Sequence, residues 1–191
     1  MNNALIFWFT GLSGAGKTTV ALGAKPLLEK KGYSVLVLDG DEIRKNLHVN
    51  LGFTKEDIKK NNALIAELCA EKRKSHDAIF VSIISPYRES RQAARALLGK
   101  RFFEVYFSAS LETAMKRDVK GLYAKAGENK TEGMIGCASG PVYEAPAAPD
   151  FVVHSQVDSP EKSVKDFYGF ALEKLQKSTK TKDPSFQKTN G

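Results

Sequence analysis

The stretch Gly-Leu-Ser-Gly-Ala-Gly-Lys-Thr at residues 11–18 has the spacing of a phosphate-binding loop: Gly, four residues, Gly, Lys and Thr. The apolar run Leu-Ile-Phe-Trp-Phe at 5–9 precedes it and predicts a buried strand, and the residues that follow predict the start of a helix. In that setting, successive backbone N–H groups and the helix dipole attract an anion. A glycine-rich turn without a ligand would also fit the spacing, but the flanks make it the weaker interpretation.

The loop predicts a site for the phosphates of a nucleoside triphosphate and for Mg²⁺. Lys17 would reach the outer phosphates, and the Thr18 hydroxyl would ligate the metal ion. The nucleotide-binding residues expected from this loop are Gly11, Ser13, Gly14, Ala15, Gly16, Lys17, Thr18 and Thr19.

The composition is that of one globular domain, since 42% of the 191 residues are hydrophobic and 27% are charged. The two cysteines, Cys69 and Cys137, form neither a disulfide framework nor a zinc motif, which favours a reducing compartment, the cytoplasm. The sequence has no signal-peptide pattern and no apolar run long enough to cross a membrane. The net charge of +7 lies partly in the C-terminal tail and partly serves phosphates, so we do not expect a nucleic-acid partner.

Apolar runs and helical patterns alternate along the chain. Strands are predicted at 5–9, 33–38, 78–84, 102–107 and 151–154, and helices at 17–31, 54–74, 88–98, 111–119 and 160–175, with a short helix through 43–47 and a potential kink at Pro26. Strands that alternate with helices through long crossovers form a parallel sheet covered on both faces. The predicted fold class is therefore α/β, a three-layer P-loop NTPase fold with a mostly parallel five-stranded sheet.

The chain is predicted to form one kinase-like domain over residues 1–176. The stretch 121–149 is rich in glycine and proline and has little periodicity, which is typical of a functional lid loop. Residues 177–191 carry four lysines against one aspartate and are predicted to be a disordered basic tail.

Three polar segments directly follow predicted strands: the phosphate loop, Asp-Gly-Asp at 39–41, and Ser-Pro at 85–86. Ligands of open parallel sheets bind beyond the carboxyl ends of the strands. We therefore expect the three segments to meet at one edge of the sheet.

The acidic segment predicts a metal and acceptor site. Asp39 would hold Mg²⁺ together with Thr18, and Asp41 would orient an acceptor hydroxyl. Arg44 follows one helical turn later and would bind an anionic substrate. An ordinary acidic first turn of a helix is the alternative, and the neighbouring phosphate loop weakens it.

The pattern favours a kinase over other P-loop proteins. The Asn-Lys-x-Asp signature of GTPases does not occur in the sequence, and the apolar third strand ends in Ser85 rather than in the acidic residues common in ATPases. A late lid loop suits a small phosphoryl-transfer enzyme that must exclude water. We therefore expect ATP as the phosphoryl donor.

Several motifs in order and spacing are similar to those of the adenylylsulfate (APS) kinase family. In the first half of the chain they are Phe-Thr-Gly-Leu-Ser-Gly-Ala-Gly-Lys-Thr-Thr at 9–19, Leu-Asp-Gly-Asp-x-x-Arg at 38–44, and Leu-Gly-Phe with Glu-Asp at 51–57. In the second half they are Ile-Ser-Pro-Tyr-Arg at 84–88, Phe-Phe-Glu-Val-Tyr at 102–106, Lys-Arg-Asp-Val-Lys-Gly-Leu-Tyr at 116–123, and Tyr-Glu-Ala-Pro at 143–146. The resemblance covers about residues 4–175. It implies that ATP with Mg²⁺ phosphorylates the 3′-hydroxyl of adenosine 5′-phosphosulfate, giving PAPS for sulfate assimilation, and that the chain can form a homodimer.

The resemblance also implies roles for individual residues. Asp41 would orient or deprotonate the acceptor hydroxyl, Arg44 and Asn61 would hold the phosphosulfate end, and Phe53 would stack on the adenine. The implied catalytic residues are Lys17, Asp41, Ser85 and Lys120, the implied acceptor-binding residues are Asp39, Asp41, Arg44, Phe53, Asn61, Ile84, Ser85, Lys120, Leu122 and Met134, and Arg117 would join the ATP side. Ser85 stands where the family carries a phosphoserine intermediate, although direct in-line transfer needs none.

The chain departs from the family on the acceptor side. Ile58 stands where an arginine is expected, and Met134 stands where a second adenine-stacking phenylalanine is expected. These changes leave open a kinase for another modified nucleotide, such as a cytidine diphosphate derivative. A non-catalytic nucleotide-binding regulator is a third hypothesis. It is opposed by four residues that are intact: Lys17, Thr18, Asp41 and Lys120.

Overall fold

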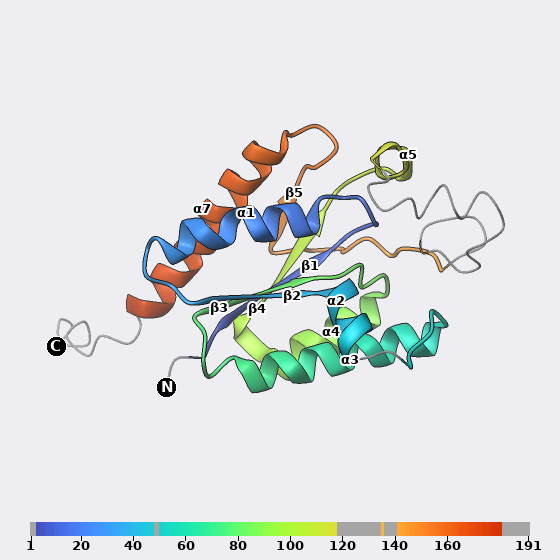
Figure 1. Ribbon diagram of the computed structural model, residues 1–191, viewed down its shortest axis with the longest axis horizontal. Coiled ribbons are helices and arrows are strands. Elements are labelled where there is room, and N and C mark those ends of the chain that lie inside the picture. Colours follow the sequence, from blue (N-terminus) through green and yellow to red (C-terminus); the bar gives the residue numbers. More distant parts are fainter. Residues whose placement is uncertain (1–2, 48–49, 118–134, 136–140, 181–191) are drawn as a thin grey trace.

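The fold is a single five-stranded sheet between two layers of helices, as the computed structural model shows for residues 3–47, 50–117, 135 and 141–180 (Figure 1). The strands are β1 (Leu5–Thr10), β2 (Val35–Asp39), β3 (Ala78–Ser82), β4 (Phe102–Phe107) and β5 (Phe151–Val153). They lie in the order β2-β3-β1-β4-β5, and each neighbouring pair is parallel. The predicted α/β fold with a parallel five-stranded sheet is confirmed.

The two central strands are apolar because the sheet buries both of their faces. Every residue of β1 and of β3 is buried, whereas β2 and β5 at the edges are partly exposed. The register places Phe9 of β1 opposite Ser82 of β3, and Ser82 opposite Asp39 of β2. The carboxyl ends of these three strands are therefore level with one another.

The helices cover both faces of the sheet. They are α1 (Lys17–Glu29), α2 (Gly40–Asn46), α3 (Lys55–Lys72), α4 (Arg88–Leu98), α5 (Leu111–Lys116) and α7 (Pro160–Lys180), with a 3₁₀ turn at Gly99–Arg101. In Figure 1, α1 and α7 lie on one face, and α2, α3 and α4 lie on the other. Among the described residues, no helix is long and apolar enough to pass through a bilayer.

Alternate side chains of β1 form two separate cores. Phe7 and Phe9 point toward α1 and α7, and Ile6 and Trp8 point toward α3 and α4. The first core is an aromatic cluster centred on Phe167 of α7, whose ring lies edge-on to other rings at centroid distances of 4.8–5.6 Å. Because Phe167 is completely buried, it fixes α7 to the sheet.

The structure corrects several predicted boundaries. The first helix ends at Glu29 and contains Pro26 without ending there, and β3 ends at Ser82 rather than at residue 84. The last helix continues to Lys180, so the predicted domain boundary at 176 lies inside α7, and residues 177–180 are helical rather than part of a disordered tail. The rest of that tail and most of the predicted lid lie outside the described residues.

The predicted start of the long third helix is confirmed in detail. Thr54 is the N-cap residue of α3, and its hydroxyl oxygen accepts a hydrogen bond from the backbone N–H of Asp57 at 3.1 Å. The same hydroxyl donates to the Asp57 carboxylate at 2.8 Å. This cap places α3 directly after the loop that contains Phe53.

Replacing Phe167 with alanine should lower the free energy of unfolding by about 3–5 kcal/mol, because the change leaves a cavity among three other rings. Phe170→Ala, at a half-buried ring on the same helix, is the matched control and should cost clearly less. Equilibrium unfolding in denaturant measures both. Equal losses at the two positions would contradict the role of Phe167 as the centre of this core.

Candidate active site

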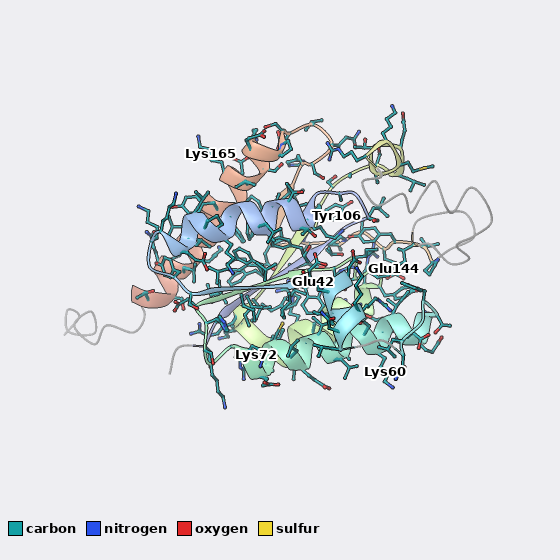
Figure 2. All side chains as sticks on the ribbon, in the orientation of Figure 1. Glu42, Lys60, Lys72, Tyr106, Glu144 and Lys165 are labelled. Atoms are coloured by element: carbon teal, nitrogen blue, oxygen red, sulfur yellow. The ribbon has the colours of Figure 1, made fainter. Side chains whose placement is uncertain are left out.

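The three polar segments that follow β1, β2 and β3 meet at one edge of the sheet, as the sequence predicts. The Thr18 hydroxyl, in the first turn of α1, donates a hydrogen bond to the Asp39 carboxylate at 2.8 Å and lies 3.0 Å from the hydroxyl oxygen of Ser82. These side chains come from the ends of three different elements. Figure 2 shows Glu42, Tyr106 and Glu144 toward the same end of the sheet.

The phosphate loop has backbone conformations that require glycine. Gly11 has φ 152°, Gly14 has φ 75° and Gly16 has φ 89°. A Cβ atom on Gly11 would lie 2.8 Å from the carbonyl oxygen of Phe107, and one on Gly14 would lie 2.8 Å from that of Ala114. The loop is therefore closely packed against the end of β4 and against α5.

Lys17 lies folded over the loop that carries it. Its ammonium donates to the carbonyl oxygens of Gly11 and Leu12 at 2.9 and 2.7 Å, and its side chain is buried. The positive charge therefore lies at the loop in which an anion would bind. A nucleotide phosphate would compete with these carbonyl groups for the ammonium.

The donor set at the strand ends suits Mg²⁺. Thr18, Asp39 and Ser82 offer two hydroxyl groups and one carboxylate, which are hard oxygen ligands. Mg²⁺ commonly binds one or two carboxylates together with substrate phosphates and water. Within the described residues no cluster of three or more His, Cys, Asp or Glu occurs, so a metal cage made of protein ligands alone is not found there.

Asp39 connects the metal side with the acceptor side. Its second carboxylate oxygen accepts a hydrogen bond from the backbone N–H of Asp41 at 2.9 Å, which caps α2. Asp41 itself is exposed in the first turn of α2. The cap thus fixes the backbone that carries the proposed acceptor-orienting carboxylate, two residues after the end of β2.

Arg44 of α2 contacts Phe53 in the loop before α3. The Arg44 guanidinium donates to the carbonyl oxygens of Leu51 and Gly52 at 3.2 and 2.9 Å and lies 4.6 Å from the centroid of the Phe53 ring. Burial lowers the pKa of Arg44, and the charges of Asp57 and Asp41 oppose that shift. Phe53 is 59% exposed, so its ring is not part of the hydrophobic core.

Ser85 is enclosed in the turn after β3, here called the Ser85 turn (residues 83–87). It has φ 45°, which is uncommon for a residue other than glycine, and it is 2% exposed. Its carbonyl oxygen accepts from the Thr10 hydroxyl at 3.2 Å, and its hydroxyl oxygen accepts from the Asn62 amide at 3.3 Å. Asn62, Thr10 and Ser82 were not identified from the sequence.

The described end of the predicted lid is attached to the Ser85 turn. Residues 143–145, here called the strap, contact it through the Glu144 backbone N–H, which donates to the carbonyl oxygen of Pro86 at 2.9 Å. The Tyr143 hydroxyl lies 2.8 Å from the Thr10 hydroxyl oxygen. Burial raises the pKa of Tyr143, so its hydroxyl stays protonated.

The remaining predicted residues fall into two groups. Asn61 is buried on α3 next to Asn62, Ile84 is half-buried in the Ser85 turn, and Arg117 is exposed at the end of α5. Lys120, Leu122 and Met134 lie outside the described residues. Ile58, which replaces an expected arginine, is 2% exposed and packs with Tyr87 and Ile135.

Comparisons with known proteins find relatives over most of the chain. The family model of adenylylsulphate kinase matches residues 3–154. An adenylyl-sulfate kinase of Halothermothrix orenii is 46% identical over 87% of this chain and 89% of that protein, and a probable adenylyl-sulfate kinase of Pyrococcus abyssi is 44% identical over 81% and 87%. The solved APS kinase of Mycobacterium tuberculosis, in complex with AMPPNP and APS, has a TM-score of 0.83 and 32% identity, and the match covers 91% of this chain and 99% of that one.

Replacing Gly11 with alanine should weaken ATP binding on the order of tenfold or more, because the new Cβ atom would displace the loop from the carbonyl oxygen of Phe107. Gly32→Ala is the matched control: Gly32 also has a positive φ, but open space surrounds it. The control should cost about 1–2 kcal/mol of stability and leave ATP binding unchanged. Calorimetric titration with a non-hydrolysable ATP analogue measures the difference, and wild-type affinity in Gly11→Ala would refute it.

Proposed function

Because this chain belongs to the adenylylsulphate kinase family, we propose that it transfers the γ-phosphoryl group of ATP to the 3′-hydroxyl of APS and so forms PAPS. The observation that carries the proposal is the contact of Thr18 with Asp39. It joins the phosphate loop to the acidic turn from which Asp41 projects, so donor and acceptor groups belong to one site. The M. tuberculosis relative holds AMPPNP and APS together, which supports the same pair of substrates here.

On the donor side, the loop backbone would bind the phosphates of ATP and Lys17 would neutralise the charge that builds up on the transferred group. Thr18 and Asp39 would hold Mg²⁺, with Ser82 hydrogen-bonded to Thr18 behind them. The metal ion, when bound, supplies electrostatic stabilisation of the phosphates. The protein contributes the arrangement of oxygen ligands and the Lys17 ammonium.

On the acceptor side, Asp41 would accept the proton of the attacking hydroxyl or orient that hydroxyl in line with the γ-phosphate. The exposed ring of Phe53 would stack on the adenine of the acceptor. Arg44 holds the loop of Phe53 through the carbonyl groups of Leu51 and Gly52, so its role includes placing that ring.

We propose direct in-line transfer rather than a phosphoserine step. The Ser85 side chain is buried, and its hydroxyl oxygen already accepts a hydrogen bond from Asn62. A phosphoryl group on that oxygen would have to replace this contact inside a closed turn. Ser85 therefore acts through the shape of its turn.

The cytoplasm is the proposed setting, since ATP is the donor and Cys69 is a buried free thiol whose pKa burial raises to about 12. A homodimer, which the family resemblance implies, stays a prediction that light scattering can measure.

Asp41→Ala should lower kcat by about 10²–10⁴-fold and leave the affinity for ATP nearly unchanged, because its role belongs to the transition state. Glu42→Ala removes an equal charge from the next residue of α2, which is also exposed, and should have little effect. Steady-state kinetics and titration with an ATP analogue separate the two quantities. If ATP binding falls together with kcat, Asp41 belongs to the metal site instead.

A panel of acceptors tests the reaction itself. With ATP and Mg²⁺, APS should be phosphorylated, whereas the 3′-deoxy analogue of APS and a cytidine diphosphate derivative should not. Lys17→Ala should abolish the transfer, which excludes a contaminating kinase and a merely regulatory nucleotide site. Transfer to the cytidine compound without transfer to APS would overturn the proposed acceptor.

A further inference from the structure

We propose that Arg91 is a positioning residue that holds the Ser85 turn and the strap in the one arrangement in which the acceptor binds. The proposal rests on the proposed function, because it concerns the acceptor half of the same site. Arg91 lies on α4, and its side chain is 2% exposed.

The three nitrogen atoms of the Arg91 guanidinium donate hydrogen bonds to three different residues. Nε donates to the Glu104 carboxylate at 2.5 Å, one terminal nitrogen donates to the carbonyl oxygen of Ser85 at 2.6 Å, and the other donates to that of Glu144 at 2.6 Å. Glu104 belongs to β4 and is itself mostly buried, so the two charges balance. A planar fork with fixed angles is suited to this task, whereas an ammonium is not.

The Ser85 turn depends on such contacts. Its positive φ is unfavourable for serine and persists only where neighbouring groups enforce it. The carbonyl oxygen of Ser85 accepts from Arg91 on one side and from Thr10 on the other. Loss of the Arg91 contact therefore removes one of the two side-chain donors to this carbonyl group.

The strap depends on the same arginine. Arg88, one turn earlier on α4, donates from its backbone N–H to the Glu144 carboxylate and from its side chain to the carbonyl oxygen of Ala145, both at 2.8 Å. Arg91 adds the contact to the Glu144 carbonyl and thereby joins the strap to Ser85 through one rigid group. The strap is the described end of the predicted lid, and these contacts fix its position beside α4 and the Ser85 turn.

Arg91 should therefore affect the acceptor and not the nucleotide. The contacts that prepare the ATP side include those of Lys17 with its own loop and of Thr18 with Asp39, and Arg91 takes part in neither. The Ser85 turn meets the phosphate loop where the Gly11 backbone N–H donates to the carbonyl oxygen of Ile84 at 3.3 Å, whereas Arg91 donates to the carbonyl oxygen of Ser85. The Ser85 turn, by contrast, carries Ile84 and Ser85, which the family resemblance places at the acceptor.

The experiment compares Arg91→Lys with Arg95→Lys. Arg95 lies one turn later on α4 and pairs with Glu104 and Asp150. Among the described residues it makes no hydrogen bond or ion pair with Ser85 or the strap, so it is the control for loss of an arginine on the same helix. Arg91→Lys should raise KM for APS at least about tenfold, the loss expected for one charged hydrogen bond, and change the affinity for an ATP analogue less than about twofold. Arg95→Lys should change neither.

Hydrogen exchange gives a readout that does not depend on the acceptor. The backbone amide of Glu144, which donates to Pro86, should exchange faster in Arg91→Lys than in the wild type or in Arg95→Lys. Unchanged exchange, or equal losses of ATP and APS affinity, would overturn the proposal. If the wild type does not phosphorylate APS, the proposed function fails, while the exchange result still decides whether Arg91 holds the strap.

Tyr143→Phe is a second variant that tests the proposal even if Arg91→Lys folds poorly. It removes only the hydroxyl that contacts Thr10, on the other side of the strap, and keeps the ring. The expected effect has the same direction and is smaller: a rise of KM for APS and faster exchange at Glu144. An unchanged KM together with unchanged exchange in this variant would count against a positioning role of the strap.

Discussion

The contact between Thr18, Asp39 and Ser82 is the constraint on which the site depends. It requires that β2, β3 and β1 lie next to one another with level carboxyl ends, which the parallel register provides. It also requires α1 to start directly after the phosphate loop, because Thr18 belongs to its first turn. A shift of one strand by one residue would turn its side chains to the other face and separate these three groups. The buried aromatic core that fixes this register therefore also sets the geometry of the metal and phosphate site.

The ion pair between Arg91 and Glu104 shows how the Ser85 turn and the strap are held together. Burying two charges costs solvation free energy, and an apolar pair of the same size can be equally stable or more stable. An apolar pair, however, could not donate to the carbonyl groups of Ser85 and Glu144. The pair is thus better explained by the orientation it imposes than by the stability it adds. Its position between β4 and α4 lets one side chain link two segments that are far apart in the sequence.

Local patterns in the sequence predict the sheet and the donor half of the site, because both depend on neighbouring residues. Apolar runs mark β1 and β3, and the phosphate loop lies within eight consecutive residues. The ends of the elements are harder to predict from local patterns. Ile83 and Ile84 continue the apolar run, but β3 ends at Ser82 and the chain turns at Ser85, which has a positive φ. α7 extends to Lys180, where the i,i+4 pair of Lys177 with Glu173 supports residues that composition assigns to a tail.

Contacts between distant segments explain what the sequence did not reveal. Thr10 with Tyr143 and Arg91 with Glu144 are separated by 133 and 53 residues, and no local spacing connects them. Ile58 is a further case. A comparison of motifs shows only that an expected arginine is missing at this position. In the structure it is buried with Tyr87 and Ile135, so the position supports apolar packing beside the Ser85 turn. An arginine there would need a partner for its charge inside this cluster. The segments proposed to bind the acceptor are therefore organised by packing and backbone carbonyl contacts, and Arg44 and Arg91 fix the positions of neighbouring segments through such contacts.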